Sequence, residues 1–263
     1  MGSVESLIKY LEKELAWCLD DVRVCEVRVG LEYAGVMLSS GEAGLAHVLR
    51  GDPPECETLE EAGELQGSTA RDMMFFATSR NLISAAIGVA TINALSQIAF
   101  KSKPNLYPFS DTDILDLVVP NDKILMVGYF APVIPKLLEK TREITVIERR
   151  NISNPIVKVA TEEQLEELSM DKDIAIITGS TLVNHTVDNV LKHCKEMREV
   201  ALVGPTASFT PQPLFERGVT AVMGVKIYNP QKMLEVISQA GGTRKLLQTC
   251  AQKTAILKKH MKL

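Results

Sequence analysis

Residues 174–184 read IAIITGSTLVN, and this stretch decides the fold. Its first five residues, Ile174 to Thr178, are apolar or β-branched and have the length of a buried strand. Gly179 follows at once, and the residues after it have the hydroxyl side chains that favour a helix start. A strand, a glycine turn and a helix in this order are typical of a parallel sheet that is covered by helices on both faces.

Similar units lie on either side of this stretch. Capping signals mark helices between them, namely Thr161 with Gln164 three residues later, and Asn229 before Pro230. We therefore predict an α/β domain over residues 109–263, a Rossmann-like, doubly wound parallel sheet. Its five strands are expected at 174–178 and at 124–127, 144–147, 200–203 and 219–223.

The N-terminal part has a different pattern, which predicts a smaller α+β domain over residues 1–108. Apolar residues recur at helical spacing over 4–15, and β-branched residues then indicate two antiparallel strands. A turn, an acidic loop with prolines and two helices follow. The predicted strands are 22–31 and 33–38, the turn is 39–44, the loop is 51–67, the helices are 71–78 and 81–100, and the linker is 101–110.

The longest apolar run, 82–100, has about the length of a membrane span. It contains Thr91, Asn93 and Ser96, so we expect a buried helix and no membrane association. With 29 basic and 33 acidic residues the net charge is -4, which gives no reason to expect a nucleic-acid partner. The five cysteines form no metal or disulfide pattern, which indicates a reducing cytoplasm. A homo-oligomer remains open.

Glycines follow four of the predicted strands, where an open parallel sheet binds its ligands. A glycine there either makes a tight turn or lets a ligand approach the backbone. The turn from Thr178 through Gly179 and Ser180 to Asn184 places hydroxyls beside backbone N–H groups, and this is an arrangement that binds anions. Gly204-Pro205-Thr206 forms a similar cluster after the fourth strand, and Gly241-Gly242-Thr243-Arg244 follows the last predicted helix.

Glu148 ends the second strand about twenty residues after Gly128, where dinucleotide-binding domains hold an acid for ribose. The turn itself reads Gly128-Tyr129-Phe130 and lacks G-x-G-x-x-G, which argues against standard NAD binding. No catalytic motif is evident either. We interpret His193, beside Cys194, as structural because adjacent helical residues point in different directions.

These strand ends carry a resemblance to a known family. The segments Val127-Gly128-Tyr129-Phe130, Val146-Ile147-Glu148, Ile176 to Asn184, Val203-Gly204-Pro205-Thr206 and Gly241-Gly242-Thr243-Arg244 together resemble the family described as "putative heavy-metal chelation", a domain of unknown function. The N-terminal half is similar to the enolase-N-terminal-like domain that accompanies it, through Gly30-Leu31, Gly44-Leu45-Ala46 and 81–94.

The resemblance implies a cleft between the two domains that binds a metal ion or a metallated cofactor. It also implies a glutamate one turn after Asn81, where this chain has Ser84, so a role for that carboxylate does not carry over. We predict that the ligand site is lined by Gly128, Tyr129, Phe130, Glu148, Thr178, Gly179, Ser180, Asn184, Gly204, Pro205, Thr206 and Asn81.

Two classes of function fit these observations. The first is a protein that binds a metal, a metallated cofactor or an anionic small molecule between the domains. The second is an enzyme that uses a nucleotide-type cofactor, S-adenosylmethionine or NAD, at the strand ends. Neither the cofactor nor any catalytic residue is identified by the sequence.

Overall fold

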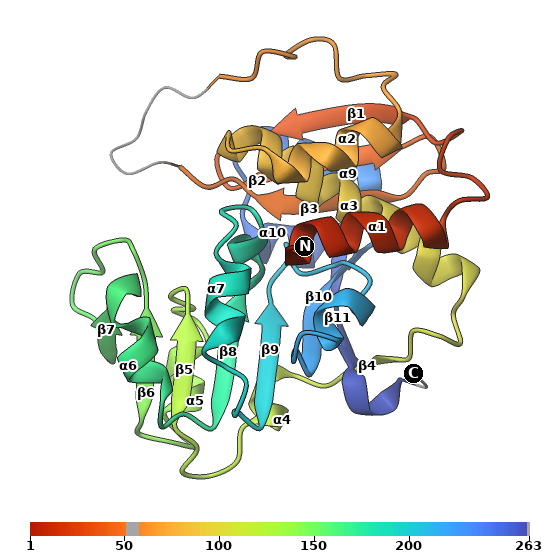
Figure 1. The fold of residues 1–263 in the computed structure, drawn as a ribbon. Coiled ribbons are helices and arrows are strands. Elements are labelled where there is room, and N and C mark those ends of the chain that lie inside the picture. Colours follow the sequence, from red (N-terminus) through yellow and green to blue (C-terminus); the bar gives the residue numbers. More distant parts are fainter. Residues whose placement is uncertain (51–57, 262–263) are drawn as a thin grey trace.

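An eight-stranded sheet forms the larger layer of the molecule, whose computed structural model describes residues 1–50 and 58–261 (Figure 1). Six parallel strands lie in the order β7-β6-β5-β8-β9-β10, and the sheet continues with β11, which pairs antiparallel with β10, and with β4, which pairs antiparallel with β11. The strands are β4 (Phe109–Ser110), β5 (Ile124–Val127), β6 (Ile144–Ile147), β7 (Lys158–Ala160), β8 (Ile174–Thr178), β9 (Glu199–Val203), β10 (Ala221–Ile227) and β11 (Ala251–Leu257).

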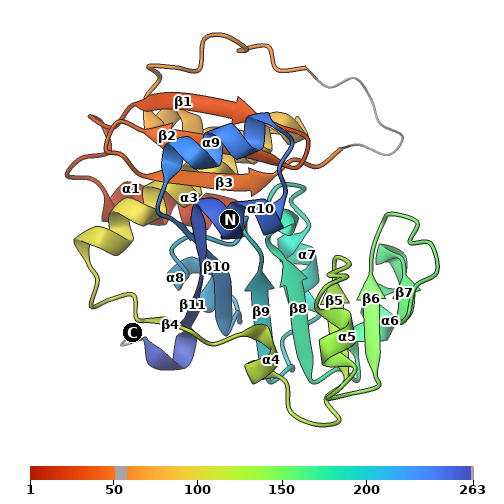
Figure 2. The same ribbon diagram turned by 180° about the vertical axis from the view of Figure 1, so that it is seen from behind.

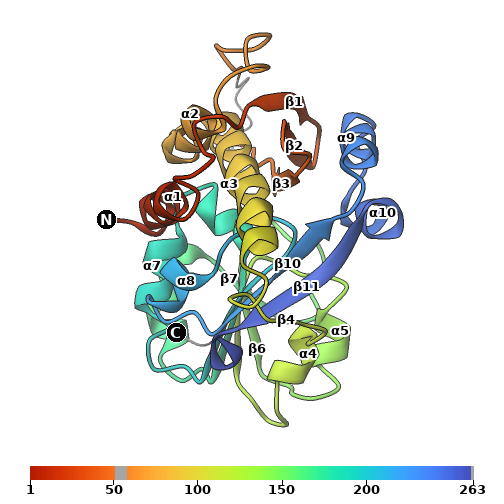
Figure 3. The same cartoon turned by 90° about the vertical axis from the view of Figure 1, so that its right-hand side faces the viewer.

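Helices cover both faces of this sheet, with α7 and α8 on one side and α4 and α5 on the other (Figure 3). Alternate residues of β5 therefore enter different cores: Leu125 belongs to one apolar cluster, and Ile124 and Met126 belong to the other. The helical segments are α4 (Ile114–Leu117), α5 (Ile134–Leu137), η2 (Glu162–Gln164), α6 (Leu165–Ser169), η3 (Gly179–Leu182), α7 (Val187–Lys192), α8 (Gln212–Phe215), α9 (Pro230–Ser238), α10 (Thr243–Thr249) and η4 (Lys258–His260).

The smaller layer is an antiparallel sheet in the order β1-β2-β3, held between α3 and α9 (Figure 3). Glycines allow the close approach on both faces. A Cβ at Gly44 would lie 2.3 Å from the Ala90 carbonyl oxygen of α3, and one at Gly35 would lie 2.5 Å from Cδ1 of Ile237 in α9. The elements are α1 (Ser3–Glu14), β1 (Val24–Val29), β2 (Tyr33–Leu38), β3 (Ala43–His47), α2 (Ala70–Phe75), η1 (Phe76–Thr78) and α3 (Leu82–Ser102).

Helix α3 is the central helix of the molecule. The sequence predicted that it would be buried. It is apolar and long enough to span a membrane, but 89% of its most apolar window is buried inside the protein. Its polar side chains bind the loop after β9: Asn93 donates to the Thr206 carbonyl at 2.9 Å, and Ser96 accepts from the Thr210 N–H at 3.0 Å. These contacts satisfy the backbone groups of a loop that is buried from 206 to 215.

The two halves of the chain interlock. Helix α9 comes from the C-terminal half but packs on β1 and β2 (Figure 2). Asp188 of α7 accepts hydrogen bonds from the Ser3 N–H at 2.9 Å and the Ser3 hydroxyl at 2.7 Å, so it caps α1 from the other half. Arg217 donates to Asp188 at 3.1 Å and holds this carboxylate in place. The predicted domain boundary at 108 and 109 remains a prediction.

The α/β class, the Rossmann-like sheet and the α+β N-terminal layer are confirmed, but several details of the prediction were wrong. Strands β3, β4, β7 and β11 were not predicted, and β10 begins two residues after the predicted start and extends to Ile227. Thr161 makes no side-chain cap, whereas Asn229 accepts from the Lys232 N–H at 3.0 Å as expected. Of the predicted acidic loop, residues 51–57 lie outside the described part of the chain, and 58–67 form turns.

Candidate functional site

The carboxyl ends of the parallel strands face the three-stranded sheet (Figure 2). The strand order reverses between β5 and β8, because β6 and β7 continue to one side and β9 and β10 to the other. Such a reversal is where open α/β sheets bind ligands. Gly128 and Thr178 meet at this point: Gly128 has a φ of +92°, and a Cβ on it would lie 3.0 Å from Cγ2 of Thr178.

The Glu148 carboxylate holds the loop after β5 to the loop after β6. Its Oε2 accepts from the Tyr129 N–H at 3.1 Å, and its Oε1 accepts from the Arg150 N–H at 3.0 Å. The Arg150 guanidinium donates to both oxygens, at 3.3 Å from Nε and 2.9 Å from Nη2. Burial alone raises the pKa of Glu148, but these hydrogen bonds and the guanidinium charge lower it below its ordinary value. The side chains of Tyr129 and Phe130 pack on the core.

The turn after β8 is closed by its own hydroxyl groups. Thr178 Oγ1 accepts from the Ser180 N–H at 3.3 Å and donates to Ser180 Oγ at 3.2 Å, and Thr181 Oγ1 donates to the Thr178 carbonyl at 2.8 Å. The Asn184 side chain accepts from Thr186 Oγ1 at 2.8 Å. Ser180 is half-buried, whereas Thr181 is buried, so the Ser180 side chain is one of the polar groups that reach the surface at this strand end.

The glycines of this edge have different structural causes. A Cβ on Gly179 would lie 2.7 Å from the Ala207 backbone nitrogen, so packing against the next loop requires a glycine there. Gly204 has a φ of +106° with open space beside it, so its glycine is required by the turn. Pro205 is half-buried beside Gly204, and Thr206 is buried.

Three residues of the smaller layer complete the edge, and the sequence did not single them out. The His47 N–H donates to Thr206 Oγ1 at 2.9 Å, and its Nε2 lies 3.6 Å from Oε2 of Glu32. The His47 ring stands edge-on to Tyr33 with 5.7 Å between centroids, and the Tyr33 hydroxyl lies 2.6 Å from Thr243 Oγ1. The Gly241-Gly242-Thr243 segment was the sequence signal nearest to this group.

His47 also responds to the charges of the Glu148 loop. Burial lowers its pKa, Arg150 lowers it further, and Glu32 and Glu148 oppose that shift. These residues lie along one edge of the sheet: Glu148, Arg150, Tyr129, Gly128 and Thr178 at the ends of β5, β6 and β8, and Gly179, Thr206, His47 and Glu32 where the smaller layer joins it. We call this set of residues the carboxyl-edge cluster.

Asn81 is the N-cap of α3. Its Oδ1 accepts from the N–H groups of Ile83 and Ser84, both at 3.0 Å, and its Nδ2 donates to the Thr58 carbonyl at 3.2 Å. The helix cap uses Oδ1 and the contact with Thr58 uses Nδ2, so both ends of the carboxamide have partners within the protein. Its role as a ligand contact remains a prediction.

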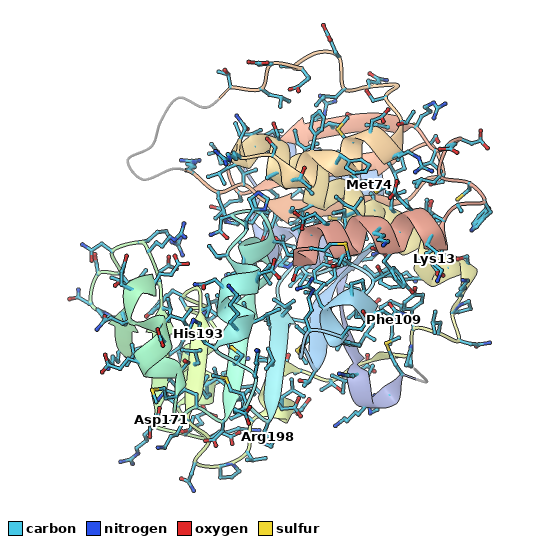
Figure 4. All side chains as sticks on the ribbon, in the orientation of Figure 1. Lys13, Met74, Phe109, Asp171, His193 and Arg198 are labelled. Atoms are coloured by element: carbon cyan, nitrogen blue, oxygen red, sulfur yellow. The ribbon has the colours of Figure 1, made fainter. Side chains whose placement is uncertain are left out.

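The described residues contain no group of three or more His, Cys, Asp or Glu side chains placed to hold a metal ion. Burial raises the pKa of the Cys194 thiol to about 12, and its Sγ donates to the Val190 carbonyl at 3.3 Å, so this thiol is a core group. Figure 4 shows its neighbour His193 beside the sheet, and Asp171 and Arg198 at the opposite end of the strands.

A cavity of about 770 Å³ lies at that opposite end, beside the starts of β6 and β7. Its buried ammonium group, Lys172 Nζ, is paired with Asp171 at 2.7 Å and Glu143 at 3.3 Å. Open α/β sheets bind ligands at the other end of their strands, so we do not take this cavity as the functional site.

Comparison with known proteins supports one family for the whole chain. Residues 113–256 match the model of DUF364 and residues 11–96 match that of DUF4213, both described as "Putative heavy-metal chelation". An uncharacterised protein of Methanocaldococcus jannaschii is 32% identical over 227 residues, which are 82% of this chain and 83% of that protein.

Two solved structures have the same fold, and both are described as DUF364 proteins of unknown function. The one from Desulfitobacterium hafniense has a TM-score of 0.79 at 22% identity and covers 97% of this chain and 100% of its own. The one from Pyrococcus horikoshii has a TM-score of 0.78 at 23% identity, with 97% and 99% covered. At this identity the likeness establishes the fold alone.

Proposed function

This chain belongs to the DUF364 family, and from that premise we propose that it binds a small anionic molecule or a metallated cofactor at the carboxyl-edge cluster. The observation that supports the proposal is the convergence of the strand ends at the reversal of strand order with His47 and Glu32 of the smaller layer. Ligand sites of open α/β sheets form at such a reversal, and they combine a few polar groups from several elements.

The described residues do not fit a bare metal ion held by protein side chains alone. A stable site for a soft metal needs several thiolate or imidazole ligands, and a site for a hard metal needs several carboxylates. At the carboxyl-edge cluster the carboxylates of Glu148 and Glu32 are each near a cation or an imidazole. We therefore propose that any metal arrives with ligands of its own, and that the protein recognises the anionic groups around it.

The fold itself favours a second candidate, an enzyme with a nucleotide-type cofactor. The order β7-β6-β5-β8-β9-β10 is that of dinucleotide-binding domains, in which an acid at the end of the second strand binds ribose. Here that acid is Glu148, whose oxygens are already occupied by Tyr129 and Arg150. Binding of S-adenosylmethionine followed by its conversion to S-adenosylhomocysteine, or binding of NAD followed by the absorbance change of its reduction, would favour the enzyme.

Ligand binding can be tested without assuming any enzymatic activity. The test is a thermal-shift screen of the full chain against divalent metals alone, tetrapyrrole complexes of metals, phosphorylated metabolites and nucleotides. A ligand at a hundred times its Kd adds about 2.7 kcal/mol to the free energy of unfolding. Ser180→Tyr places a ring in the half-buried space at the end of β8, and Ser40→Tyr adds the same ring on an exposed turn.

We expect Ser180→Tyr to abolish the shift and Ser40→Tyr to retain it. A ligand that stabilises both variants equally would place the binding site elsewhere. Stabilisation by a bare metal ion alone would show that the protein side chains can hold a metal by themselves, contrary to the proposal. We further propose a cytoplasmic protein, because Cys18, Cys25, Cys194 and Cys250 are unpaired thiols.

A further inference from the structure

The Arg150 guanidinium pairs with the Glu148 carboxylate, which stays hydrogen-bonded without this pair. Each oxygen of Glu148 has a second donor from the backbone, the Tyr129 N–H on Oε2 at 3.1 Å and the Arg150 N–H on Oε1 at 3.0 Å. The Glu148 side chain is only 10% exposed, whereas that of Arg150 is 71% exposed. The carboxylate therefore stays hydrogen-bonded when the guanidinium turns away, and no buried charge loses all its partners.

The groups around Arg150 suit an incoming oxyanion. The guanidinium lies just after the carboxyl end of β6 and is joined through Glu148 to the loop after β5, next to the point where the strand order reverses. A guanidinium supplies a planar fork of N–H donors that matches a carboxylate or a phosphate.

The neighbouring arginine provides a contrast. Arg149 is bound through Nε, at 2.9 Å, and Nη2, at 2.5 Å, to one oxygen of Glu162, and it lies on the side of the loop that faces η2. It has the same charge, the same length and the same kind of partner as Arg150. Its carboxylate partner belongs to η2, whereas the partner of Arg150 also binds the loop after β5.

We propose that Arg150 is the residue that binds the ligand's anionic group: its guanidinium leaves Glu148 and forms a bidentate pair with a phosphate or carboxylate of the small molecule. This inference rests on the proposed function and specifies its ligand class as a small-molecule oxyanion. Glu148 then acts as a positioning residue, which keeps the Tyr129 and Arg150 backbones together in both states.

The test is a titration of the full chain, followed by 15N NMR, with two probes: inorganic phosphate and succinate. We expect at least one probe to shift the Arg150 Nε–H resonance. Arg150→Gln should raise the Kd of that probe at least tenfold, whereas Arg149→Gln, which removes the same charge one residue away, should change it less than twofold. The probe that binds identifies the oxyanion as phosphate or carboxylate.

Folding does not confound this comparison, because both arginines are exposed and circular dichroism checks each variant. An unchanged Kd in Arg150→Gln, or equal losses in the two variants, would overturn the inference. So would the absence of binding by both probes to the wild-type chain. The proposed function is judged separately: a tetrapyrrole or metabolite that stabilises the wild type but not Ser180→Tyr would leave it standing after this inference had failed.

Discussion

The loop after β9 and the loop after β6 leave the same edge of the same sheet, but their polar groups are used differently. The Thr206 loop is buried, and its carbonyl, hydroxyl and N–H groups are bound by α3 and by His47. The Glu148 loop is half-exposed, and its guanidinium is an additional donor on an acid that the backbone already satisfies. The comparison teaches that a polar residue at a strand end is free for a ligand only when the fold does not already use it.

The largest loss of stability is expected at Gly179, which packs against the buried Thr206 loop. Gly179→Val should lower the free energy of unfolding by about 3 kcal/mol or more, because the new Cβ would lie 2.7 Å from the Ala207 nitrogen and backbone has little room to move. Urea denaturation measures the loss. Gly242→Ala is the control, since its Cβ meets nothing within 4 Å. Equal stability of the two variants would mean that the loop after β9 is not packed as described.

Asn93 tests the same loop from the side of α3. Asn93→Ala should cost about 2–3 kcal/mol, because the Leu45 and Thr206 carbonyls lose their donor inside the core. Chemical denaturation of this variant, compared with Asn189→Ala on the surface of α7, gives the difference. A cost as small as that of the surface variant would show that water reaches the buried loop.

Variants of Asn81 distinguish a role in helix capping from a role in ligand binding. Asn81→Ala should cost about 1 kcal/mol through loss of the α3 N-cap, and Asn81→Ser, which can still cap, should recover most of it. If Asn81 is only a cap, the Kd of the NMR probe for Asn81→Ala should match that of the wild type. Weaker binding of the probe to a variant of unchanged stability would instead assign Asn81 to the site.

Arg150 lies on the exposed side of the comparison, so its removal should hardly affect folding. We expect Arg150→Gln to change the free energy of unfolding by less than about 1 kcal/mol, since exposed ion pairs contribute little and Glu148 keeps two backbone donors. A much larger loss in denaturation would show that the pair is structural and that the guanidinium is not available to a ligand.

The smallest expected effect is a pH dependence at His47, whose N–H binds the Thr206 loop. Its folded-state pKa lies below the unfolded value near 6.5, so the unfolded chain binds the proton more readily. Stability from this group is therefore complete above that pH and is lost as the pH falls below it. Urea midpoints between pH 8 and pH 5 should fall less steeply in His47→Gln. The lowered pKa of Glu148 acts only below about pH 4.5 and does not overlap this range.

The sequence predicted five of the six parallel strands because each of the five is a short apolar run, and four of these runs are followed by a glycine. It did not predict β3 or β11, since Ala43–His47 contains two alanines and a glycine, and the first half of Ala251–Leu257 is mostly polar. For the site, it identified the strand-end glycines and Glu148 but not His47 or Arg150. Only the folded chain brings these residues together, because β3 and the loop after β6 are about 100 residues apart in sequence.

The capping of α1 by Asp188, and the covering of β1 and β2 by α9, have a consequence for synthesis on the ribosome. The first three strands emerge long before the helix that closes their second face, with roughly 10 to 40 s between them at a translation rate of about 5–20 residues per second. During that time the nascent N-terminal half has an apolar sheet surface exposed and an uncapped first helix. We therefore expect it to need a chaperone or a delay in folding, and a fragment released before α9 to aggregate.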